Sequence, residues 1–144
     1  MECKAHPFNT LGDYKFACIF ATYQGKWIFC KHKEKASREH PGGHIEEGET
    51  PLETAKRELF EETGAVDFEI EPLCDYWMRG KIKGKEISAH GQVFFATVHN
   101  LDKLPSHSEM ERVDLFTHPP DNLTYANYTD EIFPIAQKKW ERAK

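Results

Sequence analysis

The chain has 144 residues, a formal net charge of −5 at pH 7 and 12% aromatic residues. This length fits one domain, residues 1–144, and the acidic balance argues against a protein that coats nucleic acid. No apolar run is long enough to cross a bilayer, and the N-terminal segment MECKAHPFNT lacks the apolar core of a secretory signal. The four cysteines show no CxxC spacing. We therefore expect a cytoplasmic protein with free thiols and no membrane association.

Two β-rich runs flank Gln24-Gly25 near the start of the chain. The runs YKFACIFATY and KWIFCKHK are rich in the aromatic and β-branched residues typical of strands. Gln-Gly is a weaker turn signal than Asn-Gly, but it permits a two-residue connection. The sequence therefore predicts a β-hairpin here, followed by a loop over REHPGGHIEEGE.

The next segment carries the signals of both ends of a helix. Thr50 is a typical N-cap, Pro51 suits the first helical position, and Glu53 completes a capping box with Thr50. Gly64 can adopt the left-handed conformation that ends a helix. We therefore expect a helix that begins at about Pro51 and stops at Gly64.

Three glutamates gather on one side of this helix. At about 100° per residue, Glu58, Glu61 and Glu62 flank a narrow apolar stripe. The stripe consists of Leu52, Ala55, Leu59 and Thr63. Like charges four residues apart destabilise a helix by roughly 0.2–0.5 kcal/mol, and the cost grows with burial. A solvated acidic face is the common use of such a pattern, but these acids border a buried stripe and follow a glycine-rich loop, so a hard divalent cation accounts for them directly.

Beyond the helix, the pattern returns to strands and closes with a second helix. VDFEIEPL and CDYWMRG predict a strand with an irregular continuation, a turn is expected near Gly84, and residues 92–98 form a strong strand pattern. ERVDLF adds a short strand, and THPPDNLTYANY is expected to be a loop. DEIFPIAQKKWERAK predicts an amphipathic helix with Pro134 in its first turn. This order predicts an α/β protein whose mixed sheet is covered by helices on both faces.

The helix and the loop before it resemble the signature of the Nudix hydrolase family, G-x5-E-x7-R-E-U-x-E-E-x-G-U. The matching residues are Gly43, Glu49, Arg57, Glu58, Leu59, Glu61, Glu62 and Gly64. Ala65 departs from the bulky aliphatic residue of the final position, which weakens one packing contact and changes no acid. The match implies the family's α/β/α sandwich with a mixed central sheet, and the hydrolysis of a diphosphate linked to another moiety.

The resemblance also implies roles for the matched residues. The metal-binding acids of the family correspond to Glu58, Glu61 and Glu62. Gly42 matches a position whose backbone carbonyl often completes the site, with Mg²⁺ as the implied cofactor and Mn²⁺ as an alternative. Arg57 and Glu49 match positions that orient the acids, although Arg57 could also be a surface residue paired with Glu53 or Glu61 by helical spacing.

Residues outside the motif are less constrained by the resemblance. Family members often take another metal ligand or a base from a later segment, and Glu109 and Glu111 are the candidates here, although each could be a solvated loop acid. We favour Glu109, because the preceding LPSHS loop leaves it free to swing over the site. A cation must meet the remaining phosphate charge, and Lys31 and Arg38 precede the motif, but either could simply be a solubilising surface charge.

Substrate identity depends on the last quarter of the chain. The segment PPDNLTYANYTDEIFPIAQKKW looks like the corresponding region of MutT-type nucleoside triphosphatases that clear oxidised guanine nucleotides, where a loop asparagine reads the purine edge. Asn127 or Asn122 could match it, although asparagine more commonly caps a turn. The implied substrate is a nucleoside triphosphate, converted to a monophosphate and pyrophosphate. Nucleotide sugars such as ADP-ribose, RNA 5′ ends, and a nucleotide sensor without turnover are alternatives, and the intact acids argue against the sensor.

Overall fold

Eight strands and two helices follow one another in residues 1–143, the part of the chain that the computed structural model describes. The strands are β1 (Glu2–His6), β2 (Tyr14–Tyr23), β3 (Lys26–His32), β4 (Arg38–Glu39), β5 (Gly42–His44), β6 (Ala65–Ile82), β7 (Lys85–Leu101) and β8 (Met110–Phe116). The helices are α1 (Pro51–Thr63) and α2 (Ala126–Ala143). Neither helix combines the length and the apolar character that crossing a bilayer requires.

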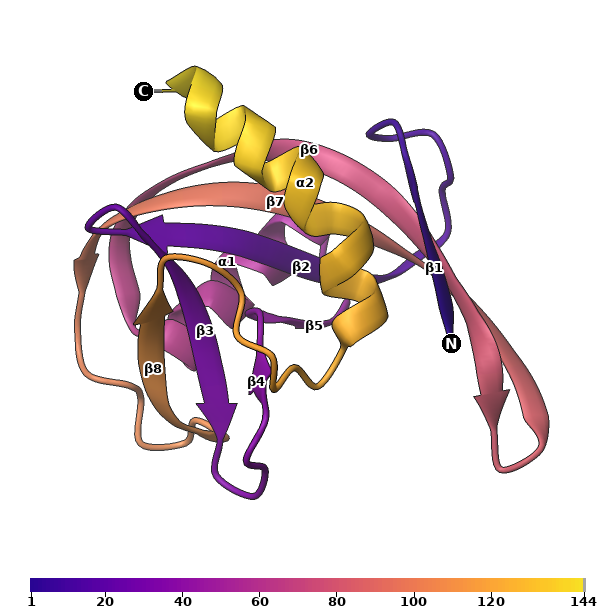
Figure 1. Cartoon of the computed structure of the whole chain (residues 1–144), viewed down its shortest axis with the longest axis horizontal. Coiled ribbons are helices and arrows are strands. Elements are labelled where there is room, and N and C mark those ends of the chain that lie inside the picture. Colours follow the sequence, from indigo (N-terminus) through magenta and orange to yellow (C-terminus); the bar gives the residue numbers. More distant parts are fainter. Residues whose placement is uncertain (144) are drawn as a thin grey trace.

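The strands form one mixed sheet in the order β1-β6-β7-β2-β3-β4 (Figure 1). Strands β2 and β7 run parallel, whereas β5 pairs antiparallel with the first half of β2 and β3 pairs with its last two residues. Strand β8 extends the β3 side of the sheet. Strands β5 and β3 pair with different parts of the same edge of β2, so they diverge from each other there. This divergence is the opening of the sheet, and the short glycine-containing strand β5 lies beside it.

Alternate side chains of β2 belong to two separate cores. Ala17 and Ile19 pack in the core that includes Ala55 and Leu59 of α1. Phe20 packs in the other core, which lies beneath α2. In Figure 1, α2 lies in front of the sheet and α1 behind it. The predicted arrangement of helices on both faces of a mixed sheet is therefore confirmed.

Helix α1 has the ends that its sequence predicts. The Thr50 side chain accepts a hydrogen bond from the backbone N–H of Glu53 (3.1 Å), and the Glu53 carboxylate accepts one from Thr50 (2.9 Å). Gly64 adopts φ 79° and donates its N–H to the carbonyl of Phe60 (2.8 Å). The predicted stripe is wrong at Leu52, which is 38% exposed, whereas the neighbouring Thr54 is fully buried and donates its hydroxyl to a loop carboxylate.

Five strands differ from the sequence expectations. β6 is one continuous strand of 18 residues with register shifts, and β7 extends well beyond the predicted 92–98 core, because the two strands pair from Ala65↔Leu101 to Ile82↔Lys85. The turn between them is at Lys83-Gly84, as predicted. The unpredicted strand β1 pairs with β6, and the loop predicted over 38–49 contains β4 and β5. Backbone hydrogen bonds between strands thus make polar segments into strands even where the sequence has no apolar pattern.

Helix α2 begins earlier than the sequence predicts. It starts at Ala126, so Pro134 lies inside the helix and not in its first turn. A proline there removes one helical hydrogen bond and normally disfavours the helix. Ile132 and Ala136, both fully buried on either side of Pro134, anchor the helix to the sheet, and their burial offsets this cost.

Asp75 of β6 fastens the segment between β1 and β2 to the sheet. Its fully buried carboxylate accepts hydrogen bonds from the backbone N–H groups of Asn9, Thr10 and Leu11, the hydroxyl of Tyr14 and the side-chain amide of Gln92. Burial alone would raise the pKa of Asp75, but the donors, with Leu11 and Tyr14 foremost, hold it below its usual range. The charged form of Asp75 therefore stabilises the native state.

We expect Asp75→Asn to lower the free energy of unfolding at pH 7 by about 1–3 kcal/mol, because the amide leaves buried donors unpaired. A carboxyl with a lowered folded pKa stabilises the protein above its unfolded pKa of about 3.9 and loses this effect as the pH falls through the folded value. Urea unfolding between pH 7 and pH 3 should therefore show the wild type and the variant converging. Asp67→Asn, at an exposed position of the same strand, is the control. A gap that does not change with pH would contradict this assignment.

Candidate active site

The glycine loop and the acidic side of α1 meet at the opening of the sheet. The backbone N–H of Gly42 donates a hydrogen bond to Glu62 Oε1 at 2.8 Å. At Gly43, the first carbon of any side chain would lie 2.7 Å from Glu58 Oε1, which is closer than atoms can approach. The contact with Glu58 explains the glycine at position 43, whereas a side chain at Gly42 would collide with the backbone of Ala17 and Cys18 in β2.

Arg57 holds the acids in place. Its Nε and Nη2 donate to both oxygens of Glu49 (2.8 and 2.9 Å), which makes a bidentate ion pair. Its Nη1 donates to Glu58 (2.8 Å) and to Glu61 (3.3 Å). The hydrogen bonds from Arg57 lower the pKa of Glu49 to about 2. The pairing of Arg57 with Glu61 that helical spacing allows is present, whereas Glu53 serves the helix cap.

Two helix acids carry an electrostatic penalty. Burial raises the pKa of Glu58, although the hydrogen bond from Arg57 acts in the opposite direction. Burial also raises the pKa of Glu62 to about 8, and the negative charges of Glu58, Glu39 and Glu109 add to this shift. A cation at this place would reverse both shifts, since it favours the ionised carboxylates.

Glu39 is a further acid of this cluster that the sequence analysis did not single out. It lies in β4, its side chain is 13% exposed, and its buried Oε2 has no hydrogen-bond partner in the described structure. The nearest cation is Lys35, whose Nζ lies 3.9 Å away. The sequence places Glu39 three residues before Gly42, and this short distance could have indicated that it belongs to the acid cluster. The direction of its side chain, however, depends on the pairing of β4 with β3.

The donor set fits a hard divalent cation such as Mg²⁺, because the carboxylates of Glu58, Glu61 and Glu62 lie on one side of α1 and hard cations prefer oxygen ligands. Within residues 1–143, no three acids, histidines or cysteines are already arranged as a closed metal cage. Arg57 occupies one oxygen of Glu58 and one of Glu61, which accounts for the open arrangement. A metal ion would therefore bind by drawing these side chains together, with Glu62 contributing the most buried carboxylate.

The structure gives the two distal acids, Glu109 and Glu111, different surroundings. Glu109 lies just before β8, its side chain is 79% exposed and 3.7 Å from His32, and its charge raises the pKa of Glu58 and Glu62. Glu111 is engaged elsewhere, in ion pairs with Arg112 (2.6 Å) and Lys31 (3.5 Å). Glu109 is therefore the distal acid whose charge acts on the helix cluster, and its side chain is exposed.

The two cations considered for phosphate binding are held by acids of the β8 side of the sheet. Lys31 contacts Glu111 at 3.5 Å, and its side chain is 17% exposed. Arg38 donates from Nε to Asp114 at 2.9 Å and from Nη1 to the carbonyl of Ala36. In this arrangement both side chains stabilise the sheet edge beside the site.

Both asparagines considered for base recognition already donate side-chain hydrogen bonds to backbone carbonyls of the protein. Asn127 lies in the first turn of α2 and not in the predicted loop, and its side-chain amide donates to the carbonyl of Met1. Asn122 does lie in the loop, where its side-chain amide donates to the carbonyl of Ala36 (3.0 Å) and its backbone carbonyl accepts from the backbone N–H of Arg38 (2.7 Å). Asn122 thus caps backbone, which is the commoner use of this residue type.

Polar groups that the sequence analysis missed lie on the α2 side of the glycine loop. The ring of His40 stacks near Phe20 with centroids 3.9 Å apart, and its Nε2 lies 3.1 Å from Thr129 Oγ1. Burial lowers the pKa of His40 to about 3, so the ring is neutral. The buried Nδ1 of His40 and the hydroxyl of Tyr128 have no hydrogen-bond partner in the described structure. His40 and Tyr128 thus adjoin the core beneath α2, where both rings contact Phe20.

Comparison with known proteins gives consistent results. The NUDIX domain model matches residues 15–137. YtkD of Bacillus subtilis (strain 168), to which an 8-oxo-dGTP diphosphatase activity is ascribed, is 32% identical over 130 residues, 87% of this chain and 79% of that protein. An RNA pyrophosphohydrolase of Psychrobacter sp. (strain PRwf-1) is 38% identical over 76 residues, 51% of this chain and 43% of that protein. The crystal structure of the Bacillus subtilis pyrophosphohydrolase BsRppH has a TM-score of 0.80 and 26% identity, covering 98% of this chain and 90% of that one.

Proposed function

The chain belongs to the Nudix hydrolase family, and we propose that it is a MutT-type enzyme that hydrolyses a nucleoside 5′-triphosphate to the monophosphate and pyrophosphate. The observation that supports this proposal most strongly is the contact of Glu58 and Glu62 with the side-chain-free backbone of the glycine loop. The ascribed activity of YtkD and the names of the RNA pyrophosphohydrolases share the cleavage of a phosphoric anhydride on a nucleotide. The four free thiols suit a cytoplasmic enzyme.

Each part of the site has a defined task in this proposal. The acids Glu58, Glu61 and Glu62, with the carbonyl of Gly42, would hold Mg²⁺, or Mn²⁺ in its place. When bound, the ion neutralises phosphate oxygens and lowers the pKa of the attacking water. Arg57 keeps the acids oriented through Glu49, and Gly43 leaves room for the carboxylate of Glu58. Glu109 can accept a proton from water, and no covalent intermediate is needed.

We infer that His40 and Tyr128 read the base in place of the two asparagines. Their unpartnered Nδ1 and hydroxyl are hydrogen-bonding groups whose burial is costly unless a ligand satisfies them. A purine edge offers both donors and acceptors, so it can pair with a neutral imidazole and a phenol at once. The rings of His40 and Tyr128 lie with their centroids 5.8 Å apart, which supports a single base contacting both.

Turnover of a substrate panel tests the proposed function. GTP, dGTP, 8-oxo-dGTP, pyrimidine triphosphates, ADP-ribose and 5′-triphosphate RNA would be incubated with Mg²⁺ or Mn²⁺ while phosphate and pyrophosphate release are measured. We expect pyrophosphate from the purine triphosphates and no release after metal chelation. Cleavage of ADP-ribose alone would replace the proposal with a nucleotide-sugar hydrolase, and binding without any turnover would make the chain a nucleotide sensor.

The distal acid gives a separate prediction. With saturating Mg²⁺, we expect Glu109→Gln to lower kcat at least tenfold, or about 1.4 kcal/mol in activation free energy, because the amide cannot accept a proton from water. Glu111→Gln is the matched control and should change kcat less than twofold, since Glu111 is paired with Arg112. Steady-state kinetics on GTP measure both. The reverse ranking would move the role to Glu111, and two normal rates would leave water activation to the helix acids.

A further inference from the structure

The turn that joins β6 to β7 is a basic hairpin on an acidic protein. We define it as residues 79–86, and in Figure 1 it extends beyond the rest of the sheet at the lower right. Its exposed cations are Arg79, Lys81, Lys83 and Lys85. Glu86 is the one carboxylate of the segment, whereas the whole chain has a net charge of −5. The basic hairpin is therefore a local positive surface on a negatively charged molecule.

Within the described residues the cations of the basic hairpin form no ion pair, although Glu2 lies opposite Arg79 and Glu86 opposite Lys81 in the strand register. Other cations are each paired with a carboxylate, among them Lys31, Arg38 and Arg57. The guanidinium of Arg79 lies 4.2 Å above the ring of Trp77. Unpaired charges repel one another, so their concentration on one hairpin favours an anionic partner.

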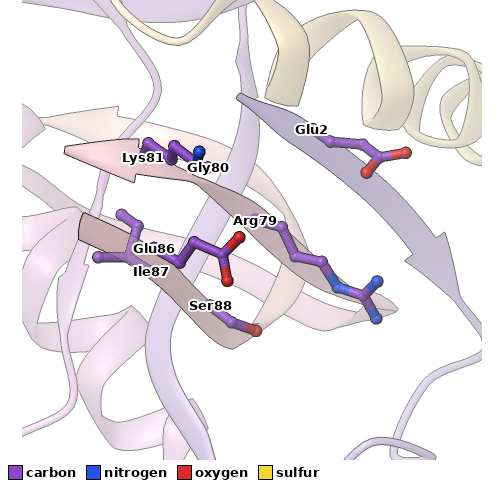
Figure 2. Close-up of a pocket in the computed structure, with 7 residues that line it drawn as sticks. All are labelled: Glu2, Arg79, Gly80, Lys81, Glu86, Ile87 and Ser88. Carbon is purple, nitrogen blue, oxygen red and sulfur yellow. The ribbon is translucent and has the colours of Figure 1, made fainter. Parts of the chain in front are cut away.

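The hairpin holds its cations in an ordered row. Backbone pairing continues from Arg79↔Ser88 to Ile82↔Lys85, and Arg79 and Lys81 point to the same face because they are two residues apart on a strand. A surface hollow of about 620 Å³ lies along this ribbon (Figure 2). Its polar lining consists of the cations Arg79 and Lys81, the hydroxyl of Ser88 and the carboxylates of Glu2 and Glu86. From Arg79 to Lys83 the row spans about 13 Å. This extent suits several successive phosphates better than one.

The strand that carries the basic hairpin also passes beside the acid site. Gly43 pairs with Ala17, and Ala17 pairs on its other side with Gln92 of β7, so Gly43 and Gln92 are two strand spacings apart, about 10 Å. Ser88 precedes Gln92 by four residues, or about 13 Å along the strand. The base of the hairpin is thus about 16 Å from the glycine loop, beyond the reach of a mononucleotide bound there but within that of a chain.

We propose that the basic hairpin binds the phosphate backbone of a single-stranded RNA whose 5′-triphosphate end occupies the acid site. The proposal rests on the proposed function and extends its substrate class from free nucleotides to RNA 5′ ends. Lysine and arginine contacts to phosphates release counterions and give affinity without sequence preference. Trp77 and Arg79 form a flat, cationic surface on which an unpaired base can stack. The acidic body of the protein confines RNA to this hairpin and the site.

A charge-neutralised variant tests the proposal. It combines Arg79→Gln, Lys81→Gln, Lys83→Gln and Lys85→Gln. The control removes the same charge from exposed positions elsewhere, with Lys26→Gln, Lys103→Gln, Lys138→Gln and Arg142→Gln. We expect the hairpin variant to lose at least tenfold in kcat/KM on 5′-triphosphate RNA, mainly through KM, and to keep the wild-type rate on GTP. The wild-type preference for RNA should also weaken steeply between 50 and 200 mM salt, and less so in the hairpin variant.

Binding of 5′-hydroxyl RNA, followed by fluorescence anisotropy, separates this proposal from the proposed function. If the wild type hydrolyses neither GTP nor RNA, the proposed function fails, while weaker RNA binding by the hairpin variant still supports the hairpin as an RNA site. Equal RNA binding and equal RNA turnover in the hairpin and control variants would overturn the inference. Hairpin-dependent binding to anionic lipid vesicles without RNA binding would also overturn it, since the partner would then be a membrane surface.

Discussion

Glu62→Gln is expected to lower kcat at least a hundredfold while the protein stays folded. The amide keeps the shape of the side chain, and its oxygen can still accept the hydrogen bond from the backbone N–H of Gly42. It cannot supply the negative charge that a divalent cation requires. A hundredfold loss corresponds to about 2.7 kcal/mol in activation free energy.

Three measurements check this result for Glu62→Gln. Turnover at saturating Mg²⁺ should fall, the thermal stabilisation that Mg²⁺ confers on the wild type should largely disappear, and the metal-free unfolding temperature should not decrease. The last expectation follows because burial raises the pKa of Glu62 to about 8, so the neutral amide resembles the form that the metal-free protein favours at pH 7. Glu47→Gln, at an exposed loop position, is the control. Wild-type turnover with an unchanged Mg²⁺ response would remove Glu62 from the metal site.

Gly43→Val should reduce kcat by a similar factor with a smaller effect on stability. The backbone of Gly43 is not in the left-handed region, so a side chain is not excluded by φ. The obstacle is Glu58, whose carboxylate lies 2.7 Å from the position of the added carbon and must therefore move away from the site. Because the carboxylate is the end of a flexible side chain, the fold can yield there while the metal site cannot. We expect a loss of no more than about 2 kcal/mol in unfolding free energy.

Gly48→Ala is the matched contrast to Gly43→Ala. Gly48 has φ +84°, but an added carbon there would meet no atom within 4 Å. Its substitution should cost stability, by about 1–2 kcal/mol, and leave kcat nearly unchanged. Urea unfolding and turnover of GTP, measured on both variants, distinguish the effects. If Gly43→Ala behaves like Gly48→Ala, the glycine loop acts only as a connection.

Features that depend on neighbours along the chain were predictable from the sequence. The ends of α1 follow from Thr50, Glu53 and Gly64, whose hydrogen bonds and backbone angles involve residues within one helical turn. The hairpin at Gln24-Gly25 is likewise a local turn, with φ 53° and 76°. The acidic face of the helix follows from helical periodicity alone. These signals are local, so tertiary contacts need not be known to read them.

Features that depend on distant residues were decided by the tertiary structure. Strand pairing turned Glu39 inward and placed the basic hairpin on a continuous β6–β7 ribbon, although neither segment has an apolar pattern. Glu111 is paired with Lys31 across strands and with its neighbour Arg112, whereas the charge of Glu109 acts on Glu62. The family, the helix that carries the acids and the mixed sheet around it were predictable from the order of the residues. Only the folded arrangement decided which charges meet, because the free energy of a charge depends on burial and on partners far along the chain.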